Sequence, residues 1–167
     1  MKQEERQRQF ESRIDEHRKI LYKVCRLYCS DQNDREDPGQ EILVQLWRSY
    51  PRFDERCLFS TWMYRVALNT AISFIRSEST RKRHIGASAP FLLEFAQAPE
   101  TESDGVRTMY ELIANMDPLH KALIVLYLDG NSYEEIATVL GISVSNVATK
   151  LNRIKNTMKK DAAAYGT

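Results

Sequence analysis

The sequence predicts an all-α fold in which two small helical domains are joined by a flexible linker. Apolar residues recur three to four positions apart in most segments, and no segment alternates as a half-buried strand would. Between the two helical halves, residues 79–106 contain several glycines and prolines, which predicts the linker. The predicted domains are residues 1–78 and 107–167, and the 43% hydrophobic content is ample for two cores.

The first domain is expected to hold three helices. Apolar residues spaced along residues 3–28 predict one long amphipathic helix. Asp37 as N-cap and Pro38 as the first helical residue predict a second helix that ends at Pro51. The third helix is expected to reach about residue 77. It is preceded by a loop over residues 52–59 and capped by the hydroxyls that follow the loop, Ser60 and Thr61.

The second domain is expected to begin with a short helix over residues 107–116. Asp117 as N-cap and Pro118 as first helical residue then predict another helix, which ends near Gly130.

The last quarter of the chain predicts a helix-turn-helix. Ser132 and Glu135 have the spacing of a capping box, Gly141 suits a left-handed helix end, and Ser143 can cap the second helix. The expected contacts between the two helices are Ile136, Ala137, Leu140, Ile142 and Val147.

Charge supports a DNA-facing second helix, because no acid occurs between Ile136 and Lys160 whereas several lysines and arginines do. The alternative is an ordinary helical hairpin with a solvated basic face. A net charge of +1 is low for a protein that holds DNA alone.

Two further segments look functional without being catalytic. Residues 59–70 combine aromatic, hydroxyl, Arg and Asn side chains, which suits single-stranded DNA. The alternative is that Trp62, Val66 and Thr70 form the core face of a helix, which leaves the loop residues as freer candidates. Residues 37–50 have a polar side and an apolar side that suit docking to another protein's helices. The alternative is that the apolar side belongs to the internal core and that the acids only complement the helix dipole. The freer loop candidates are Phe53, Asp54, Glu55 and Ser60.

Several classes of protein are not expected. We find no nucleophile elbow, phosphate-binding glycine loop or cluster of His and carboxylates, so no enzyme, metal site or cofactor is predicted. Cys25, Cys29 and Cys57 are expected to be reduced thiols. No apolar run reaches the ~18 residues of a membrane span, and the N-terminus is too charged for a signal peptide. A cytoplasmic protein without membrane insertion is predicted.

The order of these parts resembles bacterial alternative sigma factors of the extracytoplasmic-function type. The resemblance rests on Asp37, Gln40-Glu41 and Leu46-Trp47, then residues 59–69, then the C-terminal helix-turn-helix, and it covers nearly the whole chain. It implies that residues 1–78 are region two, that residues 107–167 are region four, and that the chain is a transcription initiation factor. The implied partners are core RNA polymerase, promoter DNA and an anti-sigma factor.

The resemblance also implies which side chains contact polymerase. A set on the second helix would grip or support the clamp helices of the largest subunit, and the flap of the second-largest subunit is the other implied contact. The set on the helix is Asp37, Gln40, Glu41, Gln45, Leu46 and Trp47.

For promoter DNA, the resemblance implies that the loop from Phe53 to Ser60, with Asn69 behind it, captures a flipped base of the minus-ten element. The linker would lie in the polymerase RNA channel, where the negative charge of its four acids from Glu94 to Asp104 would mimic nucleic acid. The minus-ten set is Phe53, Asp54, Ser60, Thr61, Trp62, Arg65, Asn69, Arg76, Arg81, Lys82 and Arg83. The minus-thirty-five set, in the major groove, is Ser145, Asn146, Thr149, Lys150, Asn152, Arg153 and Lys155.

Two other functions remain open on the sequence. An autonomous helix-turn-helix regulator that binds its operator as a dimer explains residues 132–160 but leaves residues 62–69 without a purpose. A helical adaptor that binds no DNA would make both basic patches solvated faces.

Overall fold

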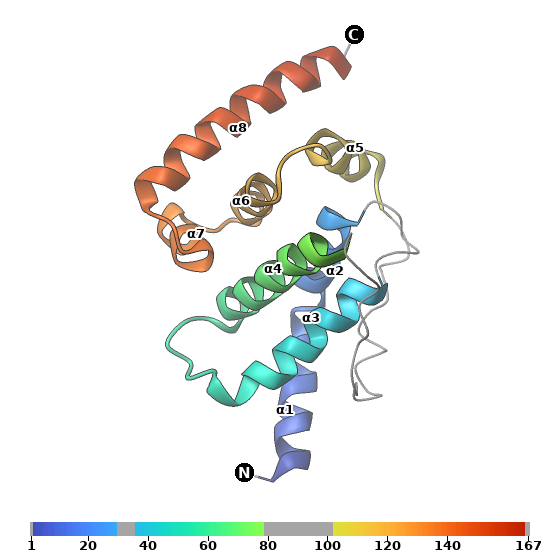
Figure 1. Ribbon diagram of the computed structural model, residues 1–167, viewed down its shortest axis with the longest axis vertical. Coiled ribbons are helices and arrows are strands. Elements are labelled where there is room, and N and C mark those ends of the chain that lie inside the picture. The colour runs from blue at the N-terminus through green and yellow to red at the C-terminus, as the bar shows by residue number, and fades with distance from the viewer. Residues whose placement is uncertain (1, 30–35, 79–101, 166–167) are drawn as a thin grey trace. The chain divides into compact units, whose positions relative to one another are not determined.

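The computed structural model describes residues 2–29, 36–78 and 102–165, and all of its regular elements within these ranges are helices. The chain divides into unit 1 (Met1–Pro99) and unit 2 (Glu100–Thr167), shown in Figure 1. The predicted all-α class is confirmed, and we describe each unit by itself.

Unit 1 begins with α1 (Gln3–Glu16) and α2 (Arg18–Tyr28), so the single long helix expected from the sequence is wrong. The break is at His17, which has φ −115° and ψ 22°. Its backbone N–H still donates to the carbonyls of Arg13 (3.2 Å) and Ile14 (3.1 Å), which closes the last turn of α1. The His17 ring then packs against Phe59 with centroids 5.1 Å apart. Tertiary packing therefore accompanies a break that apolar spacing alone does not signal.

The next elements are α3 (Glu36–Ser49) and a short 3-10 helix, η2 (Tyr50–Arg52). Because α3 begins at Glu36, Asp37 lies inside its first turn and is not the N-cap that the sequence suggested. Pro51 lies within η2, where a missing backbone N–H is tolerated in the first turn.

The last helix of unit 1, α4 (Phe59–Glu78), also begins earlier than expected. The backbone N–H of Trp62 donates to the carbonyl of Leu58 at 3.1 Å, so the helix already includes Phe59. Ser60 and Thr61 therefore belong to the first turn and are not the cap.

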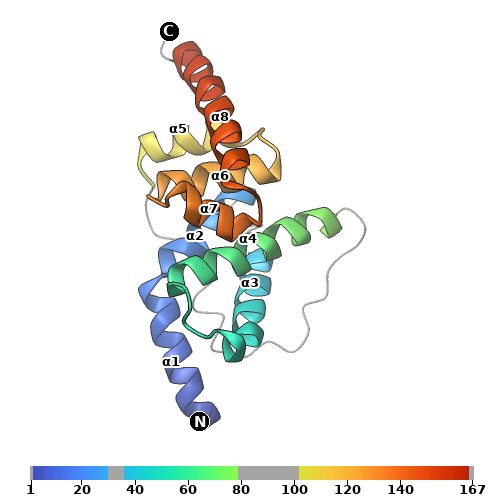
Figure 2. The same ribbon diagram turned by 90° about the vertical axis from the view of Figure 1, so that its left-hand side faces the viewer.

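The core of unit 1 lies where α2, α3 and α4 pack against one another. Figures 1 and 2 show α3 and α4 side by side, with α1 extending away from this group. Side chains with no exposed surface come from all four α-helices of unit 1, and they include Phe10, Ile14, Val24, Ile42, Leu43, Leu46, Met63 and Leu68.

Unit 2 consists of α5 (Asp104–Ile113), α6 (Pro118–Leu128), α7 (Tyr133–Leu140) and α8 (Val144–Tyr165). The long helix α8 contacts each of the other three. Val147, Leu151 and Ile154 are its buried residues, at a spacing of four and three that forms one stripe along the helix.

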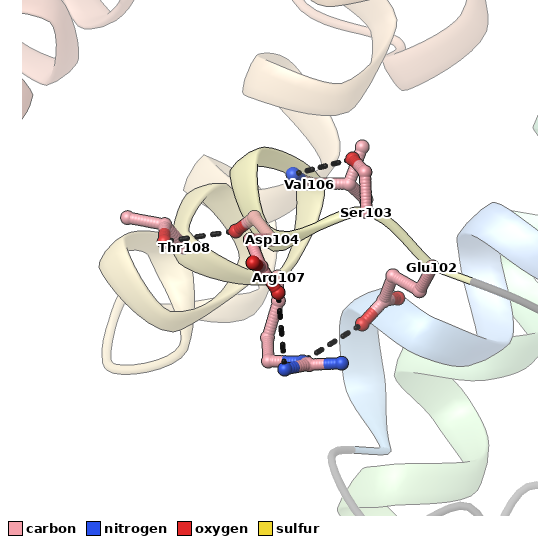
Figure 3. A network of polar contacts seen from close by, with 6 residues as sticks. All are labelled: Glu102, Ser103, Asp104, Val106, Arg107 and Thr108. Carbon is pink, nitrogen blue, oxygen red and sulfur yellow. Dashed lines mark hydrogen bonds and ion pairs between the residues drawn. The ribbon is translucent and has the colours of Figure 1, made fainter.

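The helix α5 begins at Asp104 and not at Arg107 as expected, and Figure 3 shows why. Ser103 is the N-cap, because its Oγ accepts the backbone N–H of Val106 at 3.2 Å. The Arg107 guanidinium lies 3.5 Å from the Asp104 carboxylate and 4.0 Å from that of Glu102. Glu102 and Asp104, two acids assigned to the linker, thus stabilise the start of α5. The other two linker acids, Glu94 and Glu100, lie outside the described residues.

The predicted start of α6 is confirmed. Asp117 is the N-cap, its carboxylate accepts the backbone N–H of His120 at 2.9 Å, and Pro118 is the first helical residue. The helix ends at Leu128, and Gly130 follows with a φ of +86°, which is the left-handed conformation that glycine adopts without strain.

Candidate nucleic-acid interface

The helix-turn-helix is formed by α7, a three-residue turn and α8. Ser132 Oγ accepts the backbone N–H of Glu135 at 3.1 Å, and Glu135 Oε1 accepts the backbone N–H of Ser132 at 2.9 Å. Gly141 ends α7 with φ 70° and ψ 33°, and its N–H donates to the Ala137 carbonyl at 2.8 Å. The predicted capping box and left-handed glycine are both confirmed.

The turn passes directly into α8. Ser143 Oγ accepts the backbone N–H of Asn146 at 3.0 Å, which fulfils the predicted cap. The predicted interhelix contacts Ile136, Ala137 and Val147 are buried, whereas Leu140 and Ile142 are half-buried. The two helices therefore share a small apolar contact that fixes their crossing.

The outward face of α8 carries polar side chains opposite the buried stripe of Val147, Leu151 and Ile154. This face offers amide and hydroxyl groups, which can hydrogen-bond base edges. It also offers a guanidinium, which suits guanine or phosphate. Lys150 is half-buried. The exposed members of the predicted minus-thirty-five set are Ser145, Asn146, Thr149, Asn152 and Arg153.

Lys155 lies differently from the other members of that set, because its side chain folds back onto α6 and α7. Its Nζ lies 4.1 Å from the centroid of the Tyr127 ring and 3.4 Å from the Tyr133 hydroxyl. Hydrogen bonding to Tyr127 is the main cause that raises the pKa of Lys155, and Tyr133 adds to it. In this arrangement the ammonium links three helices of unit 2.

In unit 1 the predicted minus-ten segment is supported by a cluster of aromatic rings. The Phe53 centroid lies 5.7 Å from that of Phe59 and 5.1 Å from that of Trp62. The Tyr50 centroid lies 6.2 Å from that of Trp62. These edge and tilted contacts are favourable ring geometries, so the rings brace residues 53–58, which we call the loop.

The members of the minus-ten set differ in exposure. Trp62 is 9% exposed and Thr61 is 6% exposed, so both lie on the core side of α4. The core interpretation named Trp62, whereas its other two members, Val66 and Thr70, are half-buried. The exposed members are Asp54, Asn69 and Arg76, and the half-buried ones are Phe53, Ser60 and Arg65. Arg81, Lys82 and Arg83 lie outside the described residues.

The predicted polymerase-binding set on α3 divides in the same way. Asp37 is exposed, Leu46 is fully buried, and Gln40, Glu41, Gln45 and Trp47 are half-buried. Trp47 packs edge-on against Phe10 with centroids 5.2 Å apart, so it connects α3 to α1. The amide of Gln45 donates to the Glu41 carboxylate at 3.3 Å, one turn away on the polar side of the helix.

A polar groove of about 320 Å³ brings two of the predicted sets together, because it is lined by both α3 and α4. Gln45 is in the polymerase set and Asn69 in the minus-ten set, yet both line this groove. Its volume falls in the range of small-molecule sites. The lining residues are Glu41, Gln45, Asn69, Thr70, Ser73 and Phe74.

Sequence reasoning missed two residues at the loop. Leu58 is 68% exposed, although it is a large apolar residue. Arg13 of α1 contacts the loop across 42 positions of sequence. Leu58 could have been singled out, because it is a large apolar residue inside a predicted loop. The apolar spacing along α1 does not indicate that Arg13 contacts the loop.

No group of three or more His, Cys, Asp or Glu side chains suited to a metal ion occurs within residues 2–29, 36–78 and 102–165. Cys25 is buried, and Cys29 and Cys57 are half-buried; no disulfide joins these three cysteines. In the same part of the chain, no helix is both long enough and apolar enough to cross a membrane.

The two units thus define a helical DNA-binding protein with one candidate DNA contact in each unit. Residues 13–81 match the Sigma-70 region 2 family, and residues 107–158 match the Sigma-70, region 4 family. The chain is 26% identical over 160 residues to the ECF RNA polymerase sigma factor SigW of Bacillus subtilis, covering 88% of this chain and 85% of that protein. It is 29% identical over 136 residues to the ECF RNA polymerase sigma-E factor of Haemophilus influenzae, covering 74% and 72%.

A solved structure has the same fold. It is the sigma factor RpoE in complex with the anti-sigma factor NepR from Bartonella quintana, with a TM-score of 0.69 at 17% identity, covering 91% of this chain and 95% of that one. The chain described here belongs to the sigma-70 family, as a factor of the extracytoplasmic-function type. It is a promoter-specific transcription initiation factor that acts with core RNA polymerase. The autonomous regulator is not favoured, because a sigma region accounts for each unit.

The left-handed turn generates a prediction with a matched control. Apart from the local backbone, no heavy atom lies within 4 Å of a Cβ added at Gly141 or Gly105, so neither substitution creates a clash. Gly141→Ala places Ala at φ 70° and should destabilise unit 2 by about 1 kcal/mol. Gly105→Ala lies in the first turn of α5 and should stabilise unit 2 by about 0.5 kcal/mol. Urea denaturation, followed through the methyl NMR signals of buried Val147 and Ile154, checks both signs.

The capping box predicts a pH dependence. Hydrogen bonds from the Ser132 backbone and side chain lower the pKa of Glu135 below its ordinary 4.5. A lowered folded-state pKa contributes stability above pH ~4.5 that is lost as the pH falls through the folded value. Glu135→Gln should therefore lower the thermal midpoint of unit 2 at neutral pH, and its curve should converge with that of the unchanged protein in acid. The control Glu134→Gln, outside the box, should show a smaller difference, and parallel curves for Glu135→Gln at all pH values would contradict the prediction.

Proposed function

We propose that α8 is the element that recognises the minus-thirty-five DNA, through its outward polar face. The observation that carries the proposal is the exposure of Asn146, Thr149, Asn152 and Arg153 on the side opposite the buried stripe. Arg suits the guanine edge, Asn suits the adenine edge, and Thr contacts either the backbone or a thymine methyl group. Ser145 lies at the same end, Lys150 flanks this face, and Lys155 contributes by linking α8 to α6 and α7.

In unit 1 we propose that the loop and Asn69 capture an unpaired base of the minus-ten element. A duplex hides the Watson–Crick edge of each base, so a base that is flipped into a protein site is both recognised by that edge and held in the melted state. Support comes from the half-buried Phe53, which offers a ring, and from the exposed Asn69 amide at the polar groove. Trp62 and Thr61 support the site from the core. The proposed backbone contacts are Ser60, Arg65, Arg76, Arg81, Lys82 and Arg83, with Asp54 at the loop edge.

We propose that the polar side of α3 contacts the clamp helices of the largest polymerase subunit. Asp37 is the exposed member, and Gln40, Glu41 and Gln45 are partly accessible. Leu46 and Trp47 act from inside, because Leu46 is fully buried and Trp47 packs on Phe10. Unit 2 would contact the flap of the second-largest subunit.

The remaining assignments are proposals of the same kind. Residues 1–78 form the polymerase and minus-ten domain, residues 107–167 form the minus-thirty-five domain, and the acidic linker lies in the RNA channel. An anti-sigma factor restrains the protein, as NepR binds the Bartonella quintana factor. The chain acts in the cytoplasm without a catalytic site or cofactor of its own, and polymerase supplies the chemistry.

Transcription from a randomised promoter library tests the DNA assignments. Core polymerase is combined with the protein on templates whose two elements are randomised, and the transcribed templates are sequenced. Arg153→Ala should lower the preference for one base of the minus-thirty-five element about tenfold and leave the minus-ten preference unchanged. Asn69→Ala should have the reverse selectivity, because its amide belongs to unit 1.

The design contains its own controls, since each variant reports on the element that the other leaves alone. A loss of both preferences in either variant, at equal thermal stability, contradicts the division of labour between the units. Duplex binding without polymerase-dependent transcripts restores the autonomous regulator.

The polymerase contact is tested by reversing one exposed charge. Asp37→Lys should weaken binding to core polymerase about tenfold, because a like charge then faces a surface that accepted an acid. Glu4→Lys is the matched control, as Glu4 is an exposed acid in the first turn of α1, so both variants lose a similar helix-dipole interaction. Competition binding with labelled protein gives both constants, and equal weakening by the two variants argues against this role for α3.

A further inference from the structure

Arg13 of α1 reaches across unit 1 to the loop. Its Nη2 lies 2.7 Å from Glu55 Oε1, and the two residues are 42 positions apart in sequence. Figure 2 shows α1 beside the chain that enters α4. A hollow of about 330 Å³ lies between α1 and the loop, lined among others by Gln9, Pro51 and Asp54. The Arg13 guanidinium therefore connects α1 to the loop at a place where the two segments are otherwise separated by a hollow.

The same guanidinium lies among three aromatic rings. The Arg13 Cζ is 5.5 Å from the centroid of Phe53, 5.6 Å from that of Phe59 and 5.9 Å from that of Tyr50. These distances are within the range of cation–π attraction. Phe53 is the first residue of the loop, and Phe59 is the first residue of α4, directly after the loop. One cation therefore contacts the chain at both ends of the loop and, through Glu55, its middle.

Glu55 has a backbone conformation that is uncommon for its residue type. Its φ of 63° is the only positive value at a non-glycine residue in the described part of the chain. Such a conformation persists where surrounding contacts over-determine it. The ion pair with Arg13 is the contact that its side chain makes, and the carboxylate is otherwise 68% exposed.

Arg13 itself is fixed at the end of α1. Its carbonyl oxygen accepts the backbone N–H of His17 at 3.2 Å and lies 2.9 Å from the His17 ring Nδ1. The His17 ring in turn packs on Phe59. The break between α1 and α2 thus holds both the backbone and the side chain of Arg13 against the loop.

An exposed ion pair alone contributes little to stability, because water screens it. The Arg13 side chain is 33% exposed and is stacked among rings, so its contribution here is geometric: a planar guanidinium both stacks and pairs, which an ammonium cannot do equally well. The stacking on the rings and the ion pair with Glu55 together define the position of the loop relative to α1.

We propose that Arg13 is a positioning residue for minus-ten recognition: it holds the loop in the conformation that selects the flipped base, without itself contacting DNA. The inference rests on the proposed role of the loop. It makes α1, which carries none of the DNA contacts assigned above, a determinant of base selection.

The test uses the full chain with core polymerase and the randomised promoter library. Arg13→Met keeps the apolar stem and removes the guanidinium, and it should lower the preference at the flipped minus-ten position about tenfold. Arg13→Lys should restore part of it. Core binding and the minus-thirty-five preference should stay within about twofold of the unchanged protein. The matched control is Arg8→Met on the same helix, because Arg8 pairs only locally with Glu5 at 3.6 Å, and it should behave as the unchanged protein.

A second variant protects the test from a folding failure of Arg13→Met. Glu55→Gln changes an exposed side chain at the other end of the same bridge and should weaken the same base preference. Unchanged minus-ten preference in both variants, while Asn69→Ala alters it, overturns the positioning role and leaves the proposed function intact. If none of the three variants alters that preference, the loop does not select the base, and the proposed function fails together with this inference.

Discussion

Unit 1 depends on a continuous chain of aromatic contacts. Neighbouring centroids in this chain are 5.1 to 6.2 Å apart, and each favourable pair adds ~0.5–1.5 kcal/mol beyond area burial. The rings come from α1, α3, η2, the loop and α4, so the helix proposed to dock polymerase and the loop proposed to bind DNA share one support. We therefore expect a displacement of α3 to be transmitted to the loop through these rings, and the reverse. The rings are Phe10, Trp47, Tyr50, Phe53, Phe59 and Trp62.

Unit 2 is stabilised by interactions that are closer together in sequence. The capping box, the left-handed Gly141 and the cap at Ser143 lie within a short stretch and set the two helices of the motif in place. The longer-range contribution is Lys155, which joins α8 to Tyr127 of α6 and Tyr133 of α7. The surface proposed to bind in unit 1 is therefore held by long-range contacts between aromatic rings, and the one proposed in unit 2 is held mainly by local caps and turns.

The difference in range explains what the sequence could and could not predict. Asp117, Ser132 and Gly141 act on neighbours within five residues, so their roles were visible in the sequence. The break at His17 was missed, because the apolar spacing continues across it. Among the candidate site residues, Asn69 entered the minus-ten set through the family resemblance, and its side chain is exposed. The inward orientation of Lys155 depends on tertiary neighbours that spacing does not report.

The separation of the two faces of α8 has an evolutionary consequence. Its outward residues lie opposite the stripe of Val147, Leu151 and Ile154, so they can be exchanged with little cost to folding. With α8 in its proposed role as the minus-thirty-five recognition helix, a few such substitutions would redirect the protein to a different set of genes. The loop of unit 1 lacks this freedom, because it is tied to Arg13 on another helix. With the loop in its proposed role as the minus-ten reader, a change of minus-ten preference would require paired changes in distant segments, and promoters served by descendants of this chain would diverge first at the upstream element.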